Sequence, residues 1–173
     1  MIDAFVACKP DFFPVLAANA KAFGPASVKE YPPRGGIATF TTPVDIRGLH
    51  VVSFYLSTPP KSARKGVQPG YYNWGFQVTE TAQDAAKTIS GLAKSADFEE
   101  RRGEFGWVMD LEPNWHTQND GTAIEHRSPL RMMLIRPARA PAAGSTIDCG
   151  VMASQMAGHE TMPKVSAMFG AAP

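Results

Sequence analysis

The chain has 173 residues, the length of one domain with a sizeable core, and we predict a single α+β domain over residues 1–173. Lys and Arg number 17 against 16 Asp and Glu, so the net charge of +1 supplies no field that would attract nucleic acid. No apolar run approaches the about 20 residues that a membrane-spanning helix needs. We therefore expect neither a nucleic-acid partner nor a membrane span.

The first half of the chain predicts one helix followed by three strands. Residues 10–23 form a helix because apolar side chains recur on one face, Asp11 can cap its start and a Gly-Pro pair ends it. Residues 37–42 and 49–58 are rich in β-branched and aromatic residues, which predicts a hairpin with an irregular connection. Residues 71–79 alternate aromatic and polar side chains, as a strand with one buried face does.

The second half predicts another helix and three or four strands. A Thr-Asp capping pair begins a helix of small apolar residues over 81–94. Residues 97–101 and 104–111 flank an Arg-Gly turn and predict a hairpin, and residues 130–136 and 145–152 predict two further strands. The predicted fold class is α+β: a mostly antiparallel β-sheet with two main helices packed on it, in the order helix, three strands, helix, three or four strands.

The two cysteines, Cys8 and Cys149, lie near opposite ends of the chain and do not form a C-x-x-C motif. One interpretation is a disulfide that closes a loop of most of the chain, which implies an oxidising compartment. The other is a pair of buried thiols that act as small apolar side chains. The first predicts a periplasmic or otherwise exported protein and the second a cytoplasmic one.

The segment 110–126 has the composition of a functional loop, with two His, four acidic residues and a Trp. An Asn-Asp-Gly turn signal within it predicts a long loop between two strands. Long loops on rigid scaffolds often bind partners. The alternative function is a hydrolase site, whose residues would be Asp110, His116, Asp120 and His126. A metal site is a further alternative, although the spacing matches no ligand pattern that we can identify.

Exposed aromatic, polar and basic residues are the candidates for a contact surface, because Tyr, Trp and Arg dominate interface energetics. They lie on the strand 71–79, in the segment 110–126 and in a basic loop at residues 59–66. The predicted partner-binding residues are Lys61, Arg64, Lys65, Tyr71, Asn73, Trp115, His116, Asp120 and His126.

The C-terminal segment 153–173 is predicted to be an extended or loosely packed tail. Methionines gather in and just before it around one histidine, and thioether with imidazole is a ligand set that favours Cu(I). The candidate copper ligands are Met152, Met156, His159 and Met162. The alternative is that these methionines pack against the domain as flexible gap-fillers. No other cofactor is expected.

No motif in the chain indicates a known catalytic machinery. A Gly-x-Ser-x-Gly elbow and a glycine-rich phosphate loop are absent, and His159-Glu160 does not continue into a zinc-binding His-Glu-x-x-His. His50, among apolar neighbours, is interpreted as a hydrogen-bonded core or sheet-face histidine rather than a general base. The leading hypothesis is a non-enzymatic, bacterial-type envelope protein that binds another protein, such as an inhibitor or immunity factor against a toxin or effector. A copper or small-ligand binding protein and a hydrolase are the alternatives.

Overall fold

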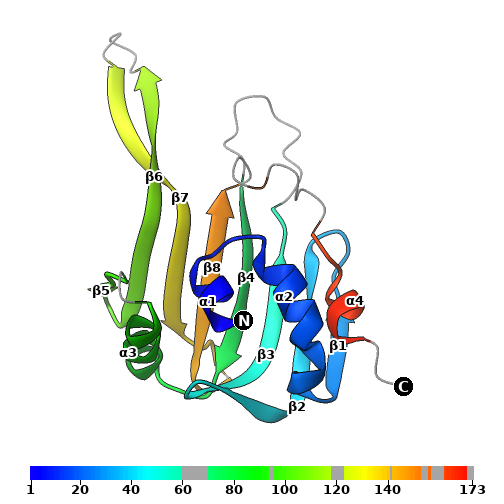
Figure 1. The fold of residues 1–173 in the computed structure, drawn as a ribbon. Coiled ribbons are helices and arrows are strands. Elements are labelled where there is room, and N and C mark those ends of the chain that lie inside the picture. Colours follow the sequence, from blue (N-terminus) through cyan, green and yellow to red (C-terminus); the bar gives the residue numbers. More distant parts are fainter. Residues whose placement is uncertain are drawn as a thin grey trace.

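An eight-stranded antiparallel sheet with short helices on one face forms the fold (Figure 1). The computed structural model describes residues 1–59, 70–93, 96–117, 123–140, 142–152, 156 and 162–170, and within 111–117 and 123–129 it describes the backbone alone. The strands are β1 (Ala26–Glu30), β2 (Gly35–Ile46), β3 (Leu49–Ser57), β4 (Tyr71–Val78), β5 (Glu99–Arg101), β6 (Glu104–Thr117), β7 (Ala123–Pro137) and β8 (Ser145–Met152). The helices are α1 (Ile2–Val6), α2 (Phe12–Asn19), the 3-10 turn η1 (Ala20–Phe23), α3 (Ala82–Leu92) and α4 (Val165–Phe169).

The strand order β1-β2-β3-β4-β8-β7-β6-β5 joins two meanders through the last strand of the chain. Strand β8 pairs antiparallel with β4, from Tyr71 opposite Met152 to Val78 opposite Ser145. It also pairs antiparallel with β7, from Arg131 opposite Val151 to Pro137 opposite Ser145. The two halves of the chain therefore build one sheet with β8 at its centre.

Two tight hairpins set the register of the flanking strands. Arg47 and Gly48 join β2 to β3 with φ of 53° and 88°, and Arg102 and Gly103 join β5 to β6 with φ of 56° and 77°. Two successive residues with positive φ form a turn whose twist matches that of the paired strands. Strand β2 also carries an irregularity between Thr39 and Val44. The predicted Arg-Gly hairpin is confirmed, and the connection between β2 and β3 is shorter than predicted.

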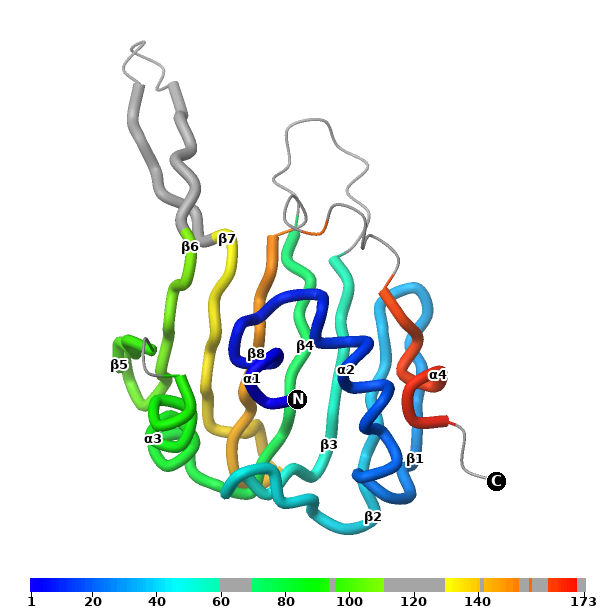
Figure 2. Tube along the Cα trace, in the orientation of Figure 1, coloured from blue at the N-terminus to red at the C-terminus, as the bar shows by residue number. Residues whose placement is uncertain are grey.

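All described helices lie on the same face of the sheet (Figures 1 and 2). Helix α4 packs on β1 and β2, whereas α3 packs on β6, β7 and β8. Helix α3 begins at Thr81, whose hydroxyl accepts a hydrogen bond of 3.2 Å from the backbone N–H of Asp84. It buries Ala85 and Ile89 against the sheet. The predicted cap and helix 81–94 are confirmed in this form.

Phenylalanines fill the space between the helices and the sheet. The ring of Phe5 lies 4.9 Å from that of Phe76 on β4, and the rings of Phe54 and Phe76 are 5.4 Å apart. Phe12 on α2 and Phe23 on η1 add their rings to the same cluster. Such pairs contribute about 0.5–1.5 kcal/mol each beyond the burial of their area. This aromatic layer fastens the N-terminal segment to the middle of the sheet.

Two further bonds hold the N-terminal segment. Cys8 and Cys149 form a disulfide with their Cα atoms 5.3 Å apart. Of the two interpretations of these cysteines, the structure therefore agrees with the disulfide. The side chain of Arg131 donates a hydrogen bond of 2.8 Å to the carbonyl of Ala7 and one of 2.5 Å to the carboxylate of Asp110. The residues that connect α1 to α2 are therefore tied to β7 and β8.

Several predicted elements need correction. The arrangement of two main helices is not well supported, because four short α-helices are described and the longest has 11 residues. The helix 10–23 tightens into η1 after Asn19, and Asp11 makes no side-chain cap. Strand β1 was not predicted at all.

No helix of the described residues has the length and apolar composition to cross a membrane.

The C-terminal residues 162–170 also differ from the expected loose tail. In α4, Val165 is fully buried and Phe169 is 7% exposed. The ring of Phe169 lies 5.4–5.6 Å from three phenylalanine rings of the core. The backbone N–H of Ser166 donates a hydrogen bond of 2.6 Å to the carboxylate of Glu30 on β1. This described part of the segment 153–173 is packed on the sheet.

Candidate functional site

The face of the sheet opposite the helices, which we call the open face, is the surface on which no described helix lies. Side chains alternate between the two faces along each strand. Cys149 points into the helix layer, where it is bonded to Cys8, so Asp148 before it points to the open face. The register of β3, β4, β8, β7 and β6 places in one row on that face Tyr55, Gly75, Asp148, Leu134 and Gly106.

The next row on the open face is polar. It runs across β3, β4, β8 and β7 and consists of Ser53, Gln77, Thr146 and Arg136. The hydroxyl of Ser53 lies 3.5 Å from the Gln77 side-chain carbonyl, and the Gln77 amide donates a hydrogen bond of 3.4 Å to the carbonyl of Ala143. The connection between β7 and β8 is thereby drawn toward this part of the open face. The helix-facing side chains in the middle of the sheet are therefore apolar, whereas this row on the open face consists of hydrogen-bonding side chains.

Asp148 is the most unusual residue of the open face, because its residue surface is only 4% exposed. Its Oδ2 accepts hydrogen bonds from Nε of Arg136 at 3.1 Å, from Nη2 of the same guanidinium, and from the Thr146 hydroxyl at 3.3 Å. Its Oδ1 is buried and has no hydrogen-bond partner within the part of the chain that the structure describes. Burial raises the pKa of the Asp148 carboxyl to about 7, and the guanidinium of Arg136 is the charge that favours its ionised form.

A pocket of about 440 Å³ lies beside this pair, and we call it the Arg136 pocket. Its size is in the range of small-molecule and side-chain sites. Charged side chains line it from two strands and from the connection that follows β7. The lining residues are Tyr55, Gln77, Glu104, Arg136, Pro137, Ala138, Arg139, Ala142 and Thr146.

Two other hollows lie elsewhere on the protein. One of about 480 Å³ runs along β5 and β6 and shares Glu104 with the Arg136 pocket. Another of about 580 Å³ is a mainly apolar groove between α2 and the residues before α4, with Phe13 and Met168 in its wall. The first extends the polar surface of the open face, whereas the second lies in the helix layer.

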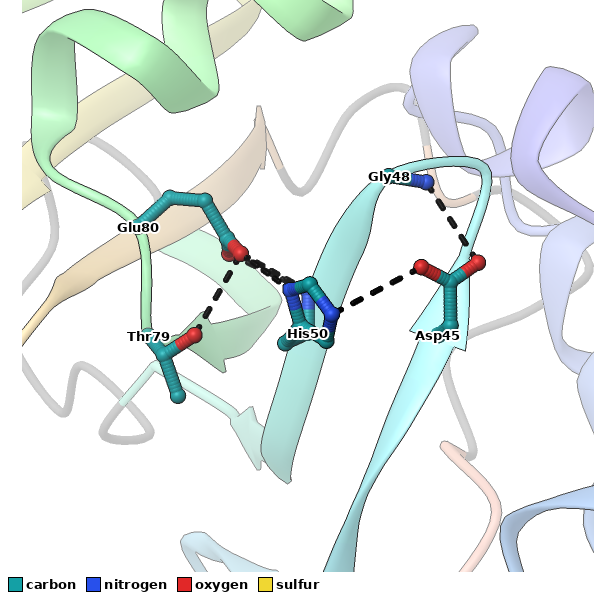
Figure 3. A network of polar contacts seen from close by, with 5 residues as sticks. All are labelled: Asp45, Gly48, His50, Thr79 and Glu80. Carbon is teal, nitrogen blue, oxygen red and sulfur yellow. Dashed lines mark hydrogen bonds and ion pairs between the residues drawn. The ribbon is translucent and has the colours of Figure 1, made fainter.

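His50 forms a separate polar cluster at the start of β3 (Figure 3). Its Nδ1 lies 2.6 Å from the carboxylate of Glu80, and its Nε2 lies 3.8 Å from that of Asp45. The backbone N–H of His50 donates to Glu80 at 3.1 Å, and the Thr79 hydroxyl donates to Glu80 at 3.3 Å. The cluster ties the hairpin of β2 and β3 to the residues that lead into α3.

The electrostatics of this cluster favour a charged pair. The hydrogen bond and the charge of Glu80 raise the pKa of His50. Partial burial by itself would raise the pKa of Glu80, but hydrogen bonds from the His50 ring and from backbone N–H groups lower it overall. Both ring nitrogens of His50 face carboxylates, so neither is placed to take a proton from a nucleophile. The interpretation of His50 as a hydrogen-bonded residue of the sheet fits this geometry.

The segment 110–126 is not a loop over most of its length, which corrects the sequence prediction. Residues 110–117 belong to β6 and residues 123–126 to β7, with Asn114 opposite His126 and His116 opposite Ile124. The side chains of Trp115, His116 and His126 lie outside the described part of the structure, as does the whole of Asp120. Asp110 is described, and it pairs with Arg131.

The other predicted binding residues have separate outcomes. Tyr71 and Asn73 lie on β4 with their side chains toward the open face, and the Asn73 amide donates a hydrogen bond of 3.1 Å to the Tyr71 carbonyl. Burial raises the pKa of Tyr71. Lys61, Arg64 and Lys65 lie outside the described residues.

The candidate copper ligands are described only in part. Met152 is 6% exposed and Met156 is fully buried, so both pack within the domain. Met162 is half-buried in the wall of the apolar groove, and His159 lies outside the described residues. Among the described side chains, no group of three or more His, Cys, Asp or Glu residues is close enough together to hold a metal ion.

Sequence reasoning missed Arg136 and Asp148 as candidate site residues. One signal was present: Asp148 is an acidic residue in the middle of an otherwise apolar and small-residue strand, at a position that alternation assigns to a sheet face. Its partner follows only from the pairing of β7 with β8. No protein-family model, curated protein or solved structure matches this chain.

Proposed function

We propose that this protein is an exported, non-enzymatic binding protein that docks another protein on the open face of its sheet. The observation that carries the proposal is the one-sided arrangement of the fold. The described helices lie on one face, and the other face presents tyrosine, amide and guanidinium side chains in rows. Sheet faces with aromatic and arginine side chains offer both contact area and directional hydrogen bonds.

The disulfide supports the exported location. Cys8 and Cys149 are both fully buried, and the bond joins the N-terminal segment to the central strand. Disulfides of this structural kind form and persist in oxidising compartments such as the periplasm. A single envelope domain that binds and blocks a toxin or effector, as an inhibitor or immunity factor does, is the specific form of the proposal.

The chemistry of the two polar clusters favours binding over hydrolysis. In one cluster, both nitrogens of His50 face carboxylates. In the other, Asp148 is held by a guanidinium and a hydroxyl that both donate to it. A hydrolytic nucleophile needs a neighbouring base with a nitrogen or oxygen directed at it. Each cluster instead uses its acids to orient a basic side chain.

Photo-crosslinking in the source cell tests the proposal. A photoreactive amino acid placed at Thr39 or Val108 samples exposed positions of the open face, and one placed at Gln83 or Lys87 samples exposed positions of α3 in the helix layer. We expect one protein to be crosslinked from the first two sites and not from the second two. Equal crosslinking from both faces, or none from the open face, would contradict the proposal.

The location is tested separately. We expect the protein in the periplasmic or extracellular fraction, with no thiol that reacts after denaturation in the absence of reductant. Recovery in the cytosol with Cys8 and Cys149 both reactive would remove the exported part of the proposal. The binding part would then depend on the crosslinking result alone.

A further inference from the structure

We propose that the Arg136 pocket binds a carboxylate group through the outer edge of the Arg136 guanidinium. The inference deepens the proposed function, because it rests on that function for the expected source of the group, an acidic side chain of the docked protein. A small free carboxylate is the other source of the same chemistry. The experiment below tests the two sources in separate arms.

The hydrogen bonds to Asp148 fix the orientation of the Arg136 guanidinium. Its Nε and Nη2 donate to Oδ2 of Asp148, so one edge of the planar group is occupied. Nη1 has no partner among the described residues, and the Arg136 side chain is 41% exposed in the wall of the pocket. A guanidinium has five N–H donors in a rigid fork, and the edge that remains can grip both oxygens of a carboxylate. Asp148 thus acts as a positioning residue.

The surroundings of that edge supply further donors. Tyr55 and Arg139 also line the pocket, and neither side chain makes a hydrogen bond to a described residue. The Tyr55 hydroxyl reaches over Gly75, since a Cβ atom built on that glycine would lie 2.9 Å from it. The site therefore combines a fixed guanidinium, a second cation and a hydroxyl. These are the groups that proteins use for carboxylates.

The charge balance selects a group with one negative charge. The pocket has two cationic side chains, Arg136 and Arg139, and one acidic side chain, Glu104. Asp148 stands behind Arg136 as a second acid. These acids would repel a dianionic phosphate more strongly than a singly charged carboxylate, which also matches the planar fork. Glu104 should therefore weaken carboxylate binding, which is a prediction of opposite sign to that for the arginines.

The test follows the ¹⁵N–¹H resonances of Arg136 Nε and of the Thr146 backbone amide in the purified protein during titration. The Thr146 amide also reports on binding in a variant that lacks the arginine. The small-molecule arm uses butyrate, its neutral amide butyramide and inorganic phosphate. The peptide arm uses a capped pentapeptide with one central Glu and the same peptide with Gln. We expect butyrate and the Glu peptide to shift the resonances with saturation, and butyramide and the Gln peptide to bind at least about tenfold more weakly. Tighter binding of the peptide than of butyrate assigns the site to a protein side chain, and the reverse assigns it to a small ligand.

Variants separate the pocket from unspecific charge effects. Arg139→Gln and Arg136→Lys should each weaken butyrate binding several-fold, as followed at the Thr146 amide, while Glu104→Gln should strengthen it. Lys87→Gln, which removes one exposed positive charge from α3, is the matched control and should leave it unchanged. Arg136→Lys keeps a cation beside Asp148, and Arg139→Gln leaves that pair intact, so neither variant strands the buried carboxyl.

Three results would overturn the inference: equal binding of the neutral analogues, tighter binding of phosphate than of butyrate, or titrations that Arg139→Gln and Arg136→Lys do not alter. The failure of the docking proposal is distinguishable from this failure. Carboxylate binding with no crosslink from Thr39 or Val108 would support the carboxylate site and contradict the docking of a protein on the open face. Crosslinks from the open face without carboxylate binding would do the opposite.

Discussion

The disulfide between Cys8 and Cys149 should be a major contributor to the stability of this protein, and its removal can be given a magnitude. The bond joins residues 141 positions apart, so it restricts nearly the whole unfolded chain. In the chain-entropy model, a loop of this length lowers the entropy of the unfolded state enough to stabilise the fold by about 5 kcal/mol at 25 °C. Domains are commonly stable by only about 5–15 kcal/mol. The double variant Cys8→Ala/Cys149→Ala should therefore lie near the limit of folding.

The fold offers a competing expectation. Phe5 is fully buried beside Phe76, and Arg131 holds the carbonyl of Ala7, so the N-terminal segment has non-covalent contacts of its own. If those contacts dominated, reduction would cost little. We expect a large loss nevertheless, because contacts within the fold do not restrict the unfolded chain, whereas the disulfide does.

Urea unfolding followed by tryptophan fluorescence decides between these expectations. We compare the oxidised protein, the protein in reductant and the double variant, each with and without reductant. The expected loss is several kcal/mol in the reduced protein and a similar loss in the variant, which should not respond to reductant. A shift of less than about 1 kcal/mol on reduction, well below the loop-closure figure, would refute the reasoning.

Three further predictions concern the packing and the polar clusters. Phe169→Ala should lower the free energy of unfolding by about 3–5 kcal/mol, since its buried ring contacts three others, whereas Val108→Ala at a 48% exposed position should change it by less than about 0.5 kcal/mol in the same urea assay. The pKa of Asp148 is raised to about 7, so the folded chain keeps a proton that the unfolded chain releases near pH 4. The free energy of unfolding of the wild type should therefore fall as the pH rises from about 4 to about 7. Asp148→Asn should lack this component when the unfolding curves of the two proteins are compared across that range. The pKa of His50 is also raised, so its pairing with Glu80 stabilises the fold below the ordinary histidine pKa, and this stabilisation is lost as the pH rises through the raised value. The difference in melting temperature between the wild type and His50→Gln should therefore shrink with increasing pH. A difference that grows would contradict the assigned pairing.

Local patterns predicted the strands that have one face against the core. The alternation in residues 71–79 corresponds to β4, and residues 145–152 are the bounds of β8. In β4 the helix-facing side chains Trp74, Phe76 and Val78 are buried, so burial imposes a period of two on the sequence. Strand β1 has only five residues and no fully buried side chain, which leaves a pattern too weak to detect.

Local sequence patterns did not predict the outer part of the hairpin of β6 and β7. Residues 111–117 and 123–129 pair with each other, and no third described strand pairs with them. Apolar alternation is imposed on a strand by packing of one of its faces, and backbone pairing within a hairpin does not require it. Polar composition together with an Asn-Asp-Gly signal then indicates a loop, although that signal marks only the turn between the strands.

The candidate site depends on contacts between segments that are separate in sequence. Asp148 and Arg136 face each other because β8 pairs with β7, and Tyr55 lies across Gly75 because β3 pairs with β4. Local propensity contains no information on which strands become neighbours. The sequence signal was limited to one acidic residue inside a strand of small and apolar residues.

The sequence by itself determined the α+β class, the antiparallel character of the sheet, helix α3 with its cap, and the strands whose burial leaves a period in the residues. The tertiary structure alone decided that β8 joins the two meanders, that the helices gather on one face, and that Cys8 meets Cys149. The physical reason is the range of the interactions. Hydrogen-bonded periodicity and capping act over a few residues, whereas strand order and the burial of Asp148 follow from packing across the whole chain.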